Sequence, residues 1–205
     1  MKTQISIILL LAVLLSGCEI SIKTGQHTDT TLPSPATNPV TPHPSDAPTG
    51  FTPGFVMPDI RITTAKGETT TLHELVQENK LVVLNFWFSD CPFCIKEFPV
   101  IEVSYQRHKA DMEILALSPV DSLEDIAAFQ DSRSLSFPMA SCTRELVTLM
   151  GIRAYPTSVF IDREGKISLI HAGAITDTRV WDRVFDFYLR EDYRHQVFAH
   201  IEDIP

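Results

Sequence analysis

A chain of 205 residues in which 44% are hydrophobic is long enough for one domain with a substantial core and short appendages. Its net charge of -9 at pH 7 argues against nucleic acid and anionic lipid as electrostatic partners, because both attract basic patches. Charge indicates nothing more about function, which has to be inferred from the motifs along the chain.

The first 17 residues have the parts of a signal peptide of the lipoprotein type. Met1 and Lys2 form a short basic start, and the apolar residues 5–15 form a stretch shorter than the roughly 20 that span a bilayer. The small-residue cleavage site that follows is Leu15-Ser16-Gly17-Cys18. Its similarity to a bacterial lipobox implies cleavage before Cys18 and lipidation of that thiol. The alternative is an ordinary secretory signal in which Cys18 is incidental.

A lipid on Cys18 would anchor the protein in the cell envelope, facing the periplasm or the cell exterior. Glu19 follows this cysteine, and by analogy with bacterial sorting rules the absence of Asp there favours the outer membrane in a cell with two membranes. Residues 18–50 are dominated by Thr, Pro, Ser and Asn, so we expect an extended, disordered linker. The folded domain is expected at residues 51–205.

Strands alternate with helices along this domain and end in a hairpin and a helix. We expect a β-hairpin at 60–64 and 68–71, a helix at 72–77, a strand at 81–88, a helix at 92–108 kinked at Pro99, a strand at 113–118, a helix at 123–132, a strand at 137–140, a helix at 144–150, a hairpin at 157–162 and 166–171, and an amphipathic helix at 177–190. Residues 191–205 could extend that helix or form a loose tail. This order predicts an α/β fold with a mixed central sheet, helices on both faces and an N-terminal β-hairpin.

A C-x-x-C pair, Cys91 and Cys94, lies where the apolar 81–88 strand turns into a helix. Cys91 falls at the expected N-cap and Pro92 at the first helical position, where its missing N–H costs nothing. Unpaired N–H groups and the helix dipole favour the thiolate of Cys91. We therefore expect an exposed Cys91 as the nucleophile and a buried Cys94 as the thiol that resolves the mixed disulfide.

Cys142 is left over once Cys18 is assigned to lipid and Cys91 is paired with Cys94 by spacing. One interpretation is a small buried hydrophobic residue at a strand end. The other is a second resolving or trapping thiol.

Three separated motifs agree in order and spacing with one known family. They are Asn85-Phe86-Trp87 before the cysteine pair, Lys96-Glu97-Phe98-Pro99 after it, and Gly151-Ile152-Arg153-Ala154-Tyr155-Pro156-Thr157 ahead of a strand. The chain thereby resembles the thioredoxin superfamily, specifically the membrane-anchored thiol-disulfide oxidoreductases of the TlpA/ResA type. The resemblance implies a thioredoxin-like fold whose redox-active disulfide serves without a further cofactor or metal.

The resemblance also implies roles for residues around the pair. Pro156 matches the cis-proline of the superfamily, and a cis bond there would present the Tyr155 backbone to an extended substrate. Trp87, Pro92 and Phe93 flank the cysteines and are candidate substrate contacts.

Glu97 matches an active-site glutamate of ResA-type proteins, which implies that its carboxylate takes the proton of Cys94 as that thiol attacks. The alternative is an ordinary solvated glutamate on a helix. Two departures from the family pattern bear on Cys91. Asp90 replaces the usual tryptophan, where its charge could oppose thiolate formation, steer cationic substrates or simply point to solvent, which is the favoured interpretation, and no histidine lies between the cysteines. The second departure favours a reductant over an oxidant.

These features predict an enzyme that reduces disulfides of exported proteins and is recharged by a membrane electron donor of the thiol-disulfide type. Cytochrome c maturation and the repair of oxidised cysteines are both compatible with it. A thiol peroxidase on the same fold is an alternative, but the residues before Cys91 lack the P-x-x-x-T/S-x-x-C arrangement. A copper chaperone is another, but the cysteine spacing is one residue short and His171 lies in no matching motif.

Overall fold

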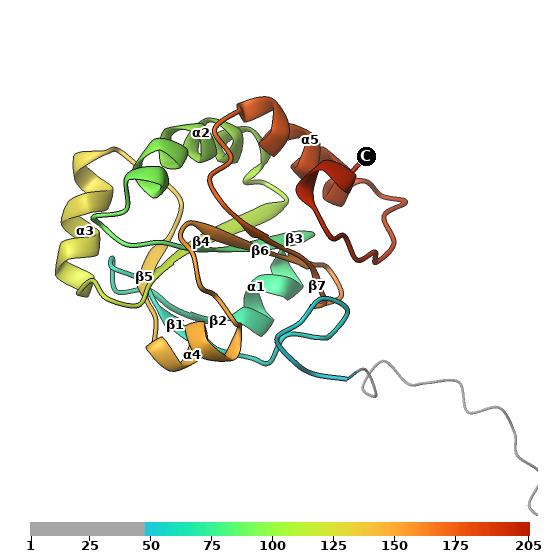
Figure 1. The fold of residues 1–205 in the computed structure, drawn as a ribbon, viewed down its shortest axis with the longest axis horizontal. Coiled ribbons are helices and arrows are strands. Elements are labelled where there is room, and N and C mark those ends of the chain that lie inside the picture. The colour runs from blue at the N-terminus through green and yellow to red at the C-terminus, as the bar shows by residue number, and fades with distance from the viewer. Residues whose placement is uncertain (1–47) are drawn as a thin grey trace, which may run out of the picture. The chain divides into compact units, whose positions relative to one another are not determined.

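The computed structural model describes residues 48–205 (Figure 1). The expected signal peptide, Cys18 and the expected linker up to residue 47 lie outside these described residues. No helix within residues 48–205 combines the length and the apolar character that a membrane crossing requires.

A five-stranded mixed sheet organises the described part of the chain, in the order β5-β4-β3-β6-β7. Its strands are β3 (Leu81–Phe86), β4 (Met112–Ser118), β5 (Met139–Ser141), β6 (Thr157–Asp162) and β7 (Ile167–Ala172). β3 runs parallel to β4, and β4 to β5, whereas β6 is antiparallel to both β3 and β7. All six residues of β3 are buried, which explains its nearly continuous apolar sequence.

Helices cover both faces of this sheet, as the sequence predicts. In Figure 1, α2 (Pro92–His108) and α5 (Thr178–Leu189) lie above the sheet, and α1 (Leu72–Glu78) and α4 (Arg144–Leu149) lie below it. The remaining α-helix of the described residues, α3 (Leu123–Ser132), lies beside β5. Alternate residues of β3 enter separate cores, since Val83 packs with α2 and α5 while Leu84 packs with α1 and α4. Odd-numbered positions of β3 therefore face α2.

The N-terminal hairpin is present but short. It consists of β1 (Arg61–Thr63) and β2 (Thr69–Thr71), which form a separate antiparallel pair. An isolated bridge between Thr64 and Ala140 links its end to the large sheet at β5.

The boundaries of two strands differ from the prediction. β3 ends at Phe86, the last residue that pairs with both β4 and β6, although the Trp87 N–H still donates to the Leu117 carbonyl at 3.1 Å. β5 begins at Met139 instead of residue 137, directly after Pro138, which has no N–H to donate to a neighbouring strand.

Residues 191–205 neither extend α5 nor form a loose tail, so both expectations were wrong. Arg190 leaves helical geometry (ψ 141°), and the chain then returns across the β6–β7 hairpin to a short 3₁₀ helix, η2 (Ile201–Asp203). Ile201 and Ile204 are buried, and their carbonyls accept hydrogen bonds from Arg183 of α5. This C-terminal segment is part of the core.

β7 is the last strand of the sheet order, and other parts of the chain bond to its backbone. Gly54 donates to the Ile167 carbonyl at 2.8 Å, and Ile167 donates to the Phe55 carbonyl at 2.9 Å. From the C-terminal segment, Phe198 donates to the Ser168 carbonyl at 3.0 Å. The two ends of the described chain therefore meet along this strand.

Candidate active site

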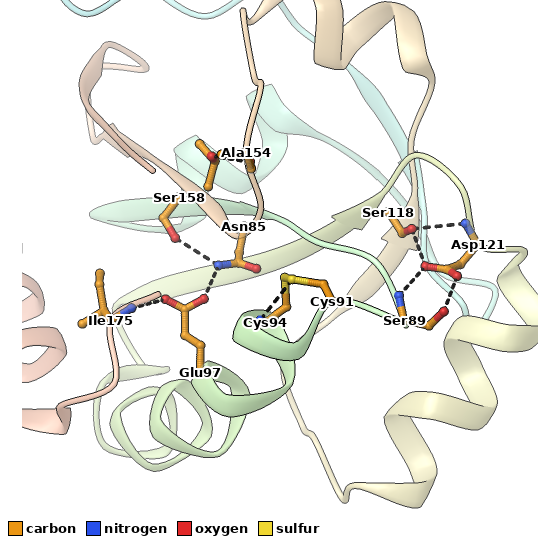
Figure 2. Close-up of a disulfide and its surroundings, with 11 residues drawn as sticks. Asn85, Ser89, Cys91, Cys94, Glu97, Ser118, Asp121, Ala154, Ser158 and Ile175 are labelled. Atoms are coloured by element: carbon orange, nitrogen blue, oxygen red, sulfur yellow. Dashed lines mark hydrogen bonds between the residues drawn. A yellow bond between two sulfur atoms is a disulfide. The ribbon is translucent and has the colours of Figure 1, made fainter. Parts of the chain in front are cut away.

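Cys91 and Cys94 form a disulfide at the junction of β3 and α2, with their Cα atoms 5.3 Å apart (Figure 2). Cys91 is the N-cap of α2 and Pro92 occupies the first turn, as the sequence predicts. The backbone N–H of Cys94 donates to the Cys91 sulfur at 3.2 Å. Because this N–H belongs to the first turn of the helix, it would stabilise a thiolate on Cys91 in the reduced protein.

The expected exposure of Cys91 was wrong. Its exposed fraction is 2%, and Cys94 is fully buried. Pro92 and Phe93, between the two cysteines, are exposed, with Phe93 at 61%. The apolar ring of Phe93 is therefore available to a partner protein, whereas Cys91 presents little surface.

Asp121 holds the loop that leads from β3 to Cys91. Its carboxylate accepts hydrogen bonds from the Ser89 N–H at 2.9 Å and the Ser89 hydroxyl at 2.7 Å. The Ser118 hydroxyl, at the end of β4, donates to the same carboxylate at 2.6 Å. These bonds tie the loop to the neighbouring strand, while Asp90 itself is exposed.

The assignment of Trp87 as a substrate contact was wrong, because its side chain is fully buried. Its ring lies 5.1 Å from that of Phe98 and 4.6 Å from that of Phe129, between centroids. The indole thus supports the site from within the core. None of its side-chain atoms reaches the surface, where a substrate could contact it.

The Tyr155–Pro156 peptide bond is cis, the isomer that the resemblance implies. The next residue, Thr157, pairs with Phe86, the last residue of β3. The cis bond therefore lies at the same end of the strands as the start of the cysteine loop. The Tyr155 ring is partly buried and packs edge-on against Phe88 of that loop, with centroids 5.3 Å apart. Pro156 and the cysteine loop are therefore neighbours.

Glu97 is fully buried, so the alternative of a solvated surface glutamate was wrong. One carboxylate oxygen accepts a hydrogen bond from the Ile175 N–H at 2.8 Å, and the other accepts one from the Asn85 side chain at 3.1 Å (Figure 2). Burial raises the pKa of Glu97 from 4.5 to about 7, although these two hydrogen bonds oppose the shift. The carboxyl can therefore exchange a proton near neutral pH.

Asn85 was absent from the predicted site residues. It lies at an odd-numbered position of β3, on the face that meets α2, and donates to both Glu97 and the Ser158 hydroxyl. A lone amide in an otherwise apolar strand was a signal in the sequence, because a buried polar group requires a partner.

Cys142 follows β5 and is partly buried, with no disulfide partner among the described residues. It packs with Leu117 and Leu146 in the core on the α1 and α4 side of the sheet. Burial raises the pKa of its thiol to about 12, which disfavours the reactive thiolate. These observations support packing, and not a second resolving thiol.

The copper-site alternative gains no support from the geometry. Within residues 48–205, no three or more His, Cys, Asp or Glu side chains are grouped so that they could hold a metal ion. His171 lies on β7, and burial lowers the pKa of its imidazole.

Residues 53–170 match the AhpC/TSA family. The thiol-disulfide oxidoreductase ResA of Halalkalibacterium halodurans is 34% identical over 128 residues, which are 62% of this chain and 69% of that protein. ResA of Bacillus subtilis is 30% identical over 132 residues, 63% of this chain and 70% of that protein.

Among solved structures, StoA of Bacillus subtilis aligns with a TM-score of 0.53 and 23% identity, over 61% of this chain and 94% of that one. This similarity shows a common fold. The chain therefore belongs to the AhpC/TSA family of thioredoxin-like proteins, together with the ResA thiol-disulfide oxidoreductases.

Proposed function

We propose that this thiol-disulfide oxidoreductase reduces disulfides of exported proteins in the cell envelope. The observation that supports this most directly is the Cys91–Cys94 disulfide at the N-terminus of α2, beside a cis-proline and a buried glutamate. The lipoprotein-type signal and Cys18 support a lipid-anchored protein outside the cytoplasm, in the outer membrane if the cell has two. Cytochrome c maturation and the repair of oxidised cysteines are both compatible roles.

The reaction begins from the dithiol form. The Cys91 thiolate attacks one sulfur of a substrate disulfide, forms a mixed disulfide and displaces the first substrate thiolate. Cys94 then attacks the Cys91 sulfur, so that the Cys91–Cys94 bond forms and the bond to the substrate breaks. The substrate gains two electrons and two protons, and the protein is left as the disulfide.

A dithiol donor at the membrane would return two electrons and two protons, restore the Cys91–Cys94 dithiol and be left as a disulfide itself. This step reverses the chemistry at the same two sulfurs and needs no bound cofactor.

Glu97 supports this chemistry as the base for Cys94. Its pKa of about 7 means that a large fraction of the carboxyl is ionised near neutral pH and can take the proton that Cys94 loses. Glu97 and Cys94 lie on the same helix, one turn apart.

The exposed Phe93 and Pro92 supply apolar contact for a substrate segment, and the Tyr155 backbone next to the cis bond supplies a polar one. Little surface of the Cys91 sulfur is open, so we expect the substrate to present its disulfide on an extended segment that fits around Phe93.

The order of the two cysteines can be tested by substitution. We expect Cys91→Ser to abolish disulfide exchange, and Cys94→Ser to accumulate mixed disulfides with substrate proteins through Cys91, measured by non-reducing electrophoresis. Cys142→Ser is the matched control and should retain turnover. Retained exchange in Cys91→Ser would contradict the mechanism.

The direction of electron flow is tested by the reduction potential of the pair. The protein with Cys142→Ser is equilibrated in thiol buffers of known potential and read by alkylation. We expect a value near or below about −250 mV, in the range of thioredoxin, for a reductant. A value above about −180 mV would mean that the protein inserts or rearranges disulfides.

A further inference from the structure

We propose that Asn85 is a positioning residue for this redox reaction, with a separate function for each end of its side-chain amide. The Nδ2 group holds the Glu97 carboxylate, and the Oδ1 atom accepts a hydrogen bond from the Cys94 thiol whenever the disulfide is reduced. This inference rests on the proposed function, in which Cys94 is the resolving thiol and Glu97 receives its proton.

Both amide hydrogens of Asn85 are already used in the oxidised protein. Nδ2 donates to Glu97 Oε2 at 3.1 Å and to Ser158 Oγ at 3.0 Å. Ser158 lies directly opposite Asn85 in the β3–β6 pair, and Glu97 lies on the helix above. Because these two partners fix the direction of Nδ2, the direction of Oδ1 is fixed as well.

The Oδ1 atom of Asn85 is buried and has no hydrogen-bond partner among the described residues. Buried carbonyl oxygens almost always have a partner, and one without a partner destabilises the state in which it occurs. Figure 2 shows the amide between the Glu97 carboxylate and the disulfide, with its nitrogen towards Glu97 and its oxygen on the side of the sulfurs. A donor for this oxygen is therefore expected from the cysteine side.

In the oxidised state neither sulfur carries a hydrogen, so the cysteines offer no donor from their side chains. Reduction places a proton on Cys94, and a thiol is a hydrogen-bond donor, though a weak one. The orphaned oxygen thus gains its partner only in the dithiol and mixed-disulfide states. The hydrogen bond stabilises these states relative to the disulfide.

The same amide fixes the position of the Cys94 thiol relative to the Glu97 carboxyl, because each of the two groups lies at one end of it. When Cys94 attacks the mixed disulfide, its proton moves to the Glu97 carboxylate, the bond between the two cysteine sulfurs forms, and the substrate leaves as a thiolate. Asn85 neither gains nor loses a proton in this step. It fixes the donor and the acceptor on either side of one planar group.

The test compares Asn85→Leu, which keeps the shape of the side chain and removes both polar ends, with the wild-type full chain. We expect the equilibrium constant for reduction by glutathione to fall roughly three- to tenfold, from the loss of one net hydrogen bond to the dithiol. A tenfold fall corresponds to a reduction potential about 30 mV lower. Ser158→Ala is the matched control, because it removes one partner of Nδ2 and keeps the hydrogen bond to Glu97, which still directs Oδ1 towards the cysteines. Its constant should stay within about twofold of the wild type.

A second measurement needs no variant at Asn85 and therefore does not depend on whether Asn85→Leu folds. In the reduced wild-type protein, the infrared S–H stretch of Cys94 is identified as the band that Cys94→Ser removes. The S–H stretch of a hydrogen-bonded thiol lies at lower frequency than that of a cysteine thiol without a hydrogen bond. We expect the lower frequency for Cys94.

An unshifted S–H band, or a glutathione constant that is the same in wild type and Asn85→Leu, would overturn the role of Asn85. The proposed function is judged separately, by the mixed disulfides of Cys94→Ser and the loss of exchange in Cys91→Ser. If the proposed function fails that test, the S–H frequency and the glutathione equilibrium constant can still be measured and still decide the role of Asn85.

Discussion

Glu97 shows how one buried carboxyl can link stability to pH. Its pKa in the folded protein, about 7, lies above its ordinary value of 4.5, so the protonated form favours the folded state. The stability that this protonated carboxyl contributes is complete below about pH 4.5 and is lost as pH rises through about 7.

We expect the free energy of unfolding of the oxidised protein to fall by about 3 kcal/mol over this pH range because of Glu97, since each pKa unit corresponds to about 1.4 kcal/mol. Urea unfolding of wild type and Glu97→Gln across the range measures the difference. The variant should lose this part of the pH dependence. Equal slopes in the two proteins would show that the buried carboxyl does not titrate as described.

At the scale of residues, the sequence predicted correctly those features that depend only on neighbouring residues in the chain. The N-cap position of Cys91 and the helical position of Pro92 follow from a strand, a turn and a helix in succession. The burial of Glu97 could not be predicted in this way, because the Ile175 N–H that covers it comes from 78 residues further along the chain. The mistaken exposure of Cys91 and the mistaken substrate role of Trp87 have the same origin.

At the scale of elements, the loop between β3 and α2 depends on β4 for its position. Asp121 receives three hydrogen bonds from Ser89 and Ser118, and these join the cysteine loop to the end of β4. A loop held at one carboxylate should be sensitive to its removal.

We expect Asp121→Ala to lower the free energy of unfolding by about 1–3 kcal/mol, because the Ser89 N–H loses its partner in a partly buried position. Disulfide exchange should also become slower as the cysteine loop loosens. Chemical unfolding and a turnover assay measure the two effects. The control is Asp125→Ala, an exposed aspartate of α3 whose loss should cost less than about 1 kcal/mol. Equal effects of the two substitutions would show that Asp121 does not hold the cysteine loop in place.

The types and order of the helices and strands were predictable from hydrophobic periodicity, whereas their ends were less so. β3 is followed by aromatic residues up to residue 88 but stops at Phe86, where its pairing with β6 ends. The strand at β5 starts after Pro138 although Phe137 is also apolar and buried. An apolar residue fits a strand and a packed turn equally well, so pattern alone does not locate the boundary.

At the scale of the whole molecule, the C-terminal segment closes the core beside β6 and β7. Asp162 of β6 accepts hydrogen bonds from Tyr193 at 3.0 Å and pairs with His195 at 2.6 Å. Residues 191–205 show no single helical or strand period, and their partners are distant in sequence. This is why periodicity left the segment undecided between a longer helix and a loose tail.

We expect Ile201→Ala to lower the free energy of unfolding by about 2–5 kcal/mol, because its side chain is only 3% exposed and its loss leaves a cavity. Val197→Ala is the matched control in the same segment, since Val197 is 54% exposed and should change stability by less than about 0.5 kcal/mol. Thermal or urea unfolding of the two variants compares them. Similar, small effects would mean that the segment does not belong to the cooperative core.

The backbone hydrogen bonds along β7 bear on how closely spaced copies of the protein associate. An open strand at the border of a sheet offers rows of N–H and C=O groups to any similar strand nearby, and proteins that are concentrated together aggregate through such rows. Here residues 54 and 55 from one end of the described chain, and Phe198 from the other, already bond to Ile167 and Ser168. If the proposed lipid holds many copies on one membrane, these bonds reduce edge-to-edge association between neighbouring molecules. Encounters with substrate proteins at the exposed Phe93 are then not blocked by such association.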